Sequence, residues 1–294
     1  MTAALRSPPA RYLGLLVGLL ALVALVLDLR SQAMSGADVL RGQSWGRLLA
    51  GLGAFVVFQL LAAASLRALI GRSALRMWAS SQLVKYLPVP GSAVLGMVGS
   101  GVRAGMEPRA ALRITFQHSL VLAGAAAVVG AVAVRDVVAA RLPGLGPLPV
   151  VAAFAAVGVG VLVGLTSARS GTSRAAVTLL LGVVAWSILG VGLWASTALG
   201  EGSALLVGSS FALAWLVGLL ALPVPAGIGI REAVLVALLT PTLGPDAAIA
   251  FSLVTRLLQV ASDVLLAAVV LPAGPWRRAG TWKQQAAVRR DRVR

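Results

Sequence analysis

Cysteine is absent from the sequence, and histidine occurs only once. Without a thiol the chain can form no disulfide, thiolate nucleophile or cysteine-ligated metal site, and a single histidine cannot supply a metal-binding cluster. Acidic residues are also scarce, with nine against 25 lysines and arginines. No serine lies in the sequence setting of a nucleophile elbow. We therefore predict a protein that is not an enzyme and that holds neither a metal nor another cofactor.

Charge of either sign is rare, because charged residues make up only 12% of the chain while hydrophobic residues make up 59%. This composition, with a mean hydropathy of +0.94, predicts an all-α integral membrane protein and not a soluble domain. The net charge of +16 gathers at the chain ends and in certain loops. The basic tail shows no nucleic-acid-binding motif, so we expect contacts with anionic lipid head groups and none with nucleic acid.

Seven apolar runs are candidates for membrane-embedded helices: 12–27, 48–70, 112–134, 150–165, 175–199, 204–222 and 247–271. The first is short enough that a cleaved signal peptide is an alternative. The tail, residues 273–294, is strongly basic, and two arginines precede the first run. By the positive-inside rule both termini lie in the cytoplasm of a multi-pass protein of the plasma or inner membrane.

One apolar run ends on two prolines and two glycines, which precede an Arg-Glu pair and a further apolar segment, 230–239. Proline removes a backbone donor and glycine adopts angles that other residues resist, so this stretch predicts a broken helix. A similar Leu-Pro-Val-Pro-Gly string occurs in the first half of the chain. The residues of the two breaks are Pro88, Pro90, Gly91, Pro223, Pro225, Gly227 and Gly229.

One break in each half predicts a single membrane domain, residues 1–294, built from two pseudo-repeats of about 1–147 and 148–272. Two topologies satisfy the charges. Six spans with two re-entrant hairpins entering from opposite faces would form an inverted repeat, whereas eight spans result if 204–222 and the segment after it both cross. The sequence repeat favours the first and the length of 204–222 favours the second.

Arg231 and Glu232 follow the second break directly, at the start of a helix whose free amides favour an anion. Arg231 could hold a phosphate in a bidentate fork, with Glu232 bracing it or accepting a proton. The alternative is a purely structural salt bridge that closes the break.

Four polar residues of the last run recur at steps of four, three and four, so they share one helix face: Ser252, Arg256, Gln259 and Asp263. A single polar stripe on an apolar helix faces a bundle interior. We expect Arg256 and Asp263 to join a network with Glu232 and to assist substrate binding together with Gln259. Structural adhesion between helices is the alternative.

Lys85 and Tyr86 precede the first break, where Lys85 could reach a lipid phosphate or extend to the inner interface. Gln117 and His118 lie within the run 112–134 and are candidates for a proton relay, although a lone histidine is more often a hydrogen-bonded core residue. The tryptophans near predicted interfaces are expected to be belt residues: Trp45, Trp78, Trp276 and Trp282.

The segment Gln82-Leu83-Val84-Lys85-Tyr86-Leu87-Pro88, the segment from Pro223 to Glu232, and Arg256 together resemble the membrane family related to the transmembrane region of lysylphosphatidylglycerol synthase. That family's marks are a K-Y-L-P segment and a later P-x-G-x-G-x-R-E segment. The resemblance implies a flippase-like domain that moves anionic, aminoacylated or isoprenoid-linked lipids between leaflets. No soluble aminoacyltransferase domain is present in this sequence, so lysyl transfer is not expected.

The leading hypothesis is a translocator of anionic phospholipid or polyprenyl-phosphate-linked lipid, whose substrate site uses Lys85, Tyr86, Arg231, Glu232, Arg256, Gln259 and Asp263. One alternative is an accessory subunit that presents a lipid-linked substrate to a glycosyltransferase or another partner protein of envelope biosynthesis. A second is an intramembrane enzyme that acts on lipid phosphate, with Glu232 and His118 as the acid-base candidates.

Overall fold

The computed structural model describes residues 44–71, 73–86, 91–141, 172–196, 204–220 and 229–271. Within these ranges the regular structure is helical throughout, which confirms the predicted all-α bundle. The described helices are α2 (Trp45–Ile70), α3 (Ala74–Val84), α4 (Ser92–Arg103), α5 (Pro108–Arg141), α7 (Thr172–Ser196), α8 (Ala204–Leu220), α9 (Ile230–Leu243) and α10 (Pro245–Val270).

Four of these helices, α2, α5, α7 and α10, are long and apolar enough to cross a bilayer. Their outer surfaces carry exposed leucine, valine, isoleucine and phenylalanine, while glutamine, serine, arginine and aspartate are buried between them. A soluble bundle has the reverse pattern, so this distribution supports a membrane protein. The predicted runs 12–27 and 150–165, the basic tail, and the prolines of both breaks lie outside the described residues.

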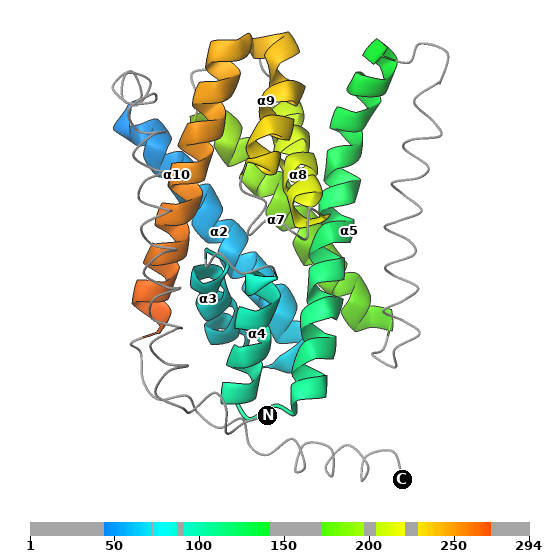
Figure 1. The fold of residues 1–294 in the computed structure, drawn as a ribbon, viewed down its shortest axis with the longest axis vertical. Helices are drawn as coiled ribbons and strands as arrows, with labels where there is room; N and C mark the ends of the chain where they lie inside the picture. The colour runs from blue at the N-terminus through cyan, green and yellow to red at the C-terminus, as the bar shows by residue number, and fades with distance from the viewer. Residues whose placement is uncertain are drawn as a thin grey trace.

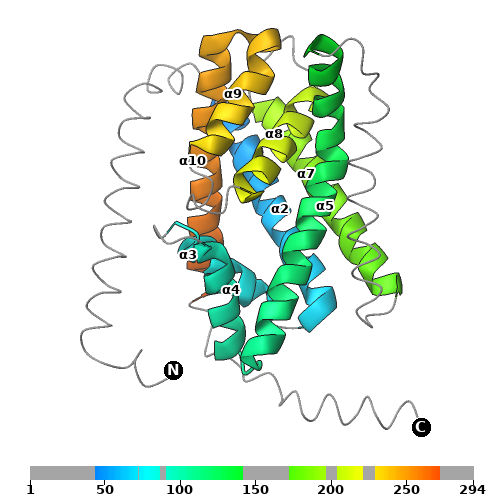
Figure 2. The same ribbon diagram turned by 45° about the vertical axis from the view of Figure 1, so that its right-hand side comes forward.

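The helices that flank the two breaks are short and form two hairpin-like pairs. At 11 and 12 residues, α3 and α4 are each too short to span a membrane, and they pack against each other. The pair α8 and α9 has 17 and 14 residues and also packs together. In Figures 1 and 2, α3 and α4 occupy the lower half of the bundle and α8 and α9 the upper half. The two pairs therefore approach the middle of the bundle from opposite ends.

The turn between the last two helices is tight, because α9 continues to Leu243 and α10 begins at Pro245. Pro241 lies in the last turn of α9, so the backbone hydrogen bond that its missing N–H removes is one near the end of the helix. Gly244, at φ +77°, closes the turn by donating its N–H to the carbonyl of Thr240 at 2.9 Å.

Small residues bring the helices of the bundle close together. A Cβ placed at Gly190 of α7 would lie 2.6 Å from the Cα of Gly208 of α8, so the two backbones touch here. At Gly192 of α7, a Cβ would lie 2.1 Å from the Cβ of Ala54 in α2. Contact of this kind is a main source of helix association in lipid, where burial of apolar surface adds little.

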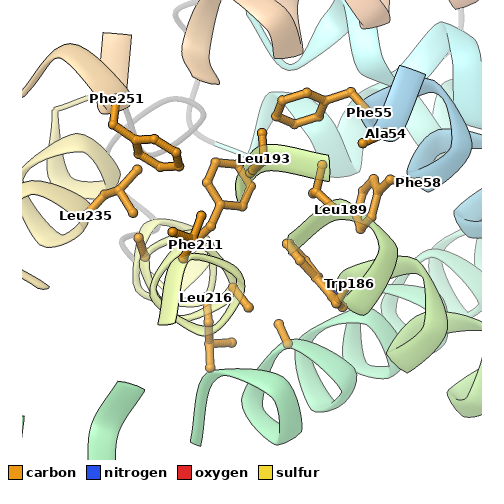
Figure 3. Close-up of a cluster of buried hydrophobic side chains, with 14 of the residues drawn as sticks. Ala54, Phe55, Phe58, Trp186, Leu189, Leu193, Phe211, Leu216, Leu235 and Phe251 are labelled. Atoms are coloured by element: carbon orange, nitrogen blue, oxygen red, sulfur yellow. The ribbon is translucent and has the colours of Figure 1, made fainter. Parts of the chain in front are cut away.

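Aromatic residues fill the centre of the bundle between α2, α7 and α8. Figure 3 shows Phe55 and Phe58 of α2 near Trp186 of α7 and Phe211 of α8. The ring centroids of Phe58 and Trp186 are 4.7 Å apart in an edge-to-face arrangement, and those of Trp186 and Trp215 are 5.0 Å apart. This cluster forms a rigid wall beside the buried polar groups described next.

Candidate functional site

The inner ends of both helix pairs meet a single stretch of α10. Asp263 of α10 is fully buried and accepts hydrogen bonds from groups on two other helices. Lys85 Nζ lies 2.7 Å from its Oδ2, and the Tyr86 hydroxyl donates to the same oxygen at 2.6 Å. Gln59 Nε2 of α2 donates to Oδ1. One carboxylate therefore links α2, the end of α3 and α10.

A second set of contacts fixes the groups that surround Asp263. Trp78 Nε1 donates to Gln59 Oε1 at 2.6 Å, which leaves the amide nitrogen of Gln59 free to face Asp263. Lys85 Nζ also donates to Gln82 Oε1 at 2.7 Å. Ser92 Oγ, at the start of α4, donates to the Lys85 carbonyl at 3.0 Å and ties the two helices of the first pair together.

The start of α9 contributes a second charged cluster. Glu232 Oε1 lies 3.4 Å from Arg231 Nη2 and 3.6 Å from Arg256 Nη1 of α10. Arg231 Nη1 donates to Gln259 Oε1, one turn along α10 from Arg256. The Arg256 guanidinium also lies 5.6 Å from the centroid of the Tyr86 ring, within cation-π range. The two clusters are therefore adjacent along one face of α10.

A glycine with a positive φ angle precedes each of the helices that follow the two breaks, α4 and α9. Gly229 has φ +83° and precedes α9, where its N–H donates to Glu232 Oε2 at 2.7 Å. Gly91 has φ +70° and precedes α4. Other residues rarely adopt these backbone angles. Because Glu232 caps the helix through one oxygen and faces two arginines through the other, local folding fixes the position of its charge.

Several buried charged atoms in this cluster lack hydrogen-bond partners within the described part of the chain. These are the donors Nε and Nη2 of Arg231 and Nη2 of Arg256, and the acceptor Oε1 of Glu232, which lies at ion-pair distance from Arg231 Nη2 without a hydrogen bond. The two arginine side chains are only 4% and 3% exposed, respectively. Buried donors are nearly always satisfied, and a buried unsatisfied group on a charged side chain is especially costly. An anion placed between these arginines would supply the missing acceptors.

A cavity of about 190 Å³ lies beside the charged clusters. Lys85, Arg231 and Arg256 line it, whereas Asp263 and Glu232 do not. Among the described residues, the cavity lining therefore contains cationic side chains and no carboxylate. Three amide side chains add polar groups to its surface, and six aromatic side chains form its walls: Gln59, Gln82, Gln259, Phe55, Phe58, Trp78, Trp186, Phe211 and Trp215.

The two relay candidates on α5 differ in position. His118 lines the cavity and is buried, with Nε2 2.8 Å from Ser65 Oγ and 3.0 Å from the Ala62 carbonyl oxygen. Gln117 is half-buried and does not line the cavity. These hydrogen bonds match the core role that is common for a lone histidine. No group of three or more metal-ligating side chains occurs in the ranges that the structure describes.

Some of the predicted site residues have different partners from those expected. Lys85 does not extend to the interface, because it pairs with Asp263 inside the bundle, where it also lines the cavity. Asp263 joins Lys85 and not Glu232, while Arg256 does reach Glu232 as predicted. Trp78 is buried and hydrogen-bonded, so its assignment to an interface belt is wrong.

Sequence reasoning also missed Gln59, although a lone glutamine inside the apolar run 48–70 is the kind of signal that marks a buried polar contact. Pro88, Pro90, Pro223, Pro225 and Gly227 lie outside the described residues, so only the flanking residues of each break are placed here.

The fold and the site together define a class: a helical membrane protein with two opposed short helix pairs and a cation-lined internal cavity where they meet. Neither protein-family models nor curated proteins yield a match to this chain.

Proposed function

We propose that this protein binds the phosphate of an anionic membrane lipid in the central cavity and moves that lipid between the two leaflets. The observation that supports this most strongly is the placement of three cations on the cavity surface, two of them arginines with unsatisfied buried donors. Guanidinium groups match phosphate geometry because they present paired donors in one plane. The aromatic wall beside them suits the apolar remainder of a lipid.

The position of the cavity supports movement as well as binding. Transporters built from inverted repeats place their substrate where broken helices from the two halves meet, and they expose that place alternately to each side. Here α3 ends and α9 begins beside the cavity, and the two helices reach it from opposite directions. Each is attached to α10 through its own polar contacts, Lys85 to Asp263 and Arg231 to Gln259. Small movements of either pair against α10 would open the cavity on one side.

Each residue then has a role in this proposal. Arg231 and Arg256 hold the phosphate, and Lys85 approaches it while Asp263 and Tyr86 keep the lysine in place. Glu232 pairs with both arginines, which offsets their mutual repulsion and holds them in place. The family resemblance in the K-Y-L-P and P-x-G-x-G-x-R-E segments points to the same lipid substrates. We also propose a plasma or inner membrane location with both termini in the cytoplasm, in accordance with the basic tail.

The test is lipid translocation by the purified protein in liposomes, with head-group-labelled anionic phospholipid or polyprenyl phosphate as the substrate. The variant Arg231→Ala removes a cavity cation, and Arg109→Ala removes an exposed arginine at the start of α5 as the matched control. We expect Arg231→Ala to lower the rate at least about tenfold, as loss of one charged hydrogen bond predicts, and Arg109→Ala to leave it unchanged.

The proposal would be abandoned if the intact protein moved none of these lipids, or if folded Arg231→Ala protein moved them at the normal rate. In the first case, stable copurification with an envelope enzyme would favour the accessory-subunit alternative.

A further inference from the structure

The charges around the cavity do not cancel. Among the described residues, the two clusters contain three cationic side chains, Lys85, Arg231 and Arg256, and two carboxylates, Glu232 and Asp263. With His118 neutral, one positive charge is left over. The other polar groups lining the cavity are amides, hydroxyls and an imidazole, which add no charge.

This residual charge is buried. Arg231 and Arg256 are almost fully buried, and aromatic side chains line the cavity beside them. Charges in such surroundings interact more strongly than in water, so an occupant that restores neutrality is favoured over one that leaves a charge of either sign.

The unsatisfied donors indicate where that occupant would bind. They belong to the two arginines, whereas the Lys85 ammonium already has two acceptors, Asp263 and Gln82. The two guanidinium groups and the Glu232 carboxylate together carry one net positive charge, while Lys85 and Asp263 cancel each other. The net positive charge of the whole site therefore lies at the two arginines.

From this balance we infer that the cavity selects a phosphodiester with a single negative charge over a phosphomonoester or diphosphate with two or more. A phosphodiester offers two unesterified oxygens to the guanidinium donors and neutralises the site. A phosphomonoester carries close to two negative charges at pH 8, since its second pKa is about 6, and would leave the site negative. This inference deepens the proposed function because it names the head-group chemistry of the lipid.

Binding is measured directly by titration calorimetry at pH 8 on the full chain in neutral detergent micelles. An imidazole with the ordinary pKa of about 6.5 is uncharged at that pH. Two short-chain lipids with the same acyl chains serve as probes: phosphatidylmethanol, a phosphodiester, and phosphatidic acid, a phosphomonoester. Dimethyl phosphate tests whether the phosphodiester alone is enough without a lipid tail.

We expect wild-type protein to bind phosphatidylmethanol at least about tenfold more tightly than phosphatidic acid, because one uncompensated buried charge is worth at least that factor. Glu232→Gln raises the residual charge from one to two and keeps the size of the side chain. It should reverse the preference toward phosphatidic acid. Asp263→Asn makes the same change of charge on the other cluster and serves as a second variant if Glu232→Gln fails to fold.

Equal or tighter binding of phosphatidic acid by the wild type would overturn the inference, as would an unchanged preference in both folded variants. If dimethyl phosphate binds as tightly as phosphatidylmethanol, the selection by charge is supported, but the conclusion that the ligand is a lipid is overturned. Because no step of this experiment requires translocation, selective binding without movement would refute the proposed function and leave the inference standing.

Discussion

Asp263→Asn is the substitution that tests most directly how the first helix pair is held to the bundle. The Asp263 carboxylate contacts Lys85 Nζ at 2.7 Å and the Tyr86 hydroxyl at 2.6 Å, and it accepts a further hydrogen bond from Gln59. The asparagine has nearly the same shape but carries no charge. Lys85 then keeps only Gln82 as an acceptor, and its ammonium is left buried without a counter-charge.

The expected loss of stability follows from the distance and the burial. At 2.7 Å and an effective dielectric constant of about 20, the attraction between the two charges is about 6 kcal/mol before desolvation is counted. In the intact pair, the cost of desolvating the two charges offsets much of this attraction. When one partner is removed, the remaining charge stays buried and nothing offsets its desolvation cost. Breaking a buried pair in this way typically costs about 3–5 kcal/mol, and we expect Asp263→Asn to fall in that range.

The assay is the free energy of unfolding in detergent micelles, measured by denaturant titration with tryptophan fluorescence as the signal. Lys85→Gln and the double variant complete a double-mutant cycle. The loss of stability in the double variant should be smaller than the sum of the two single losses by at least about 1.5 kcal/mol, because the double variant removes both charges together. Asp246→Asn is the control, since this aspartate is exposed at the start of α10 and should cost less than about 1 kcal/mol.

Strictly additive losses for Lys85→Gln and Asp263→Asn would refute this reasoning. So would a loss for Asp263→Asn no larger than that for Asp246→Asn. Either result would mean that the lysine and the aspartate do not depend on each other, and that their ion pair does not hold the first helix pair to α10.

Two further substitutions test the packing and the support of the site. Gly190→Ala should lower the thermal unfolding temperature and the free energy of unfolding, the latter by about 1–3 kcal/mol, because the new Cβ would lie 2.6 Å from the Gly208 backbone. The control is Gly53→Ala, which has no atom within 4 Å of the new Cβ and should be neutral or stabilising. Trp78→Phe removes the indole donor to Gln59 and should cost about 1–3 kcal/mol in the same unfolding assay, while Trp45→Phe, at an 81% exposed position, should cost almost nothing. A stable Gly190→Ala protein, or equal effects of the two tryptophan substitutions, would contradict the described packing.

Local rules were sufficient to predict several parts of the site. The steps of four, three and four along the last run place four polar residues on one face, and Ser252, Arg256 and Asp263 are indeed buried there. Proline and glycine likewise indicated both helix breaks, and the helices beside them are short. These features depend on spacing within one segment, which the sequence shows directly.

Partners across the bundle could not be predicted in the same way. Lys85 and Asp263 lie 178 positions apart in the numbering, and nothing in either segment indicates that the end of α3 meets the middle of α10. The mistake over Trp78 has the same cause. A tryptophan near the end of an apolar run is an interface residue if the run spans the membrane, but it is central if the run turns back inside the bundle.

The arrangement of charges on α10 suggests why both helix pairs end at the same place. Asp263 holds the first pair through Lys85, whereas Arg256 and Gln259 face the start of α9 through Glu232 and Arg231. These contacts lie within two turns of one straight helix, so a phosphate bound by both arginines would sit between the two attachments. It would bridge Arg231 of α9 to Arg256 of α10 and so strengthen the contact of α9 with α10, while Lys85 stays paired with Asp263. An anionic ligand would therefore tighten the second pair and leave the first unchanged, which is the differential effect that a shift between two states requires.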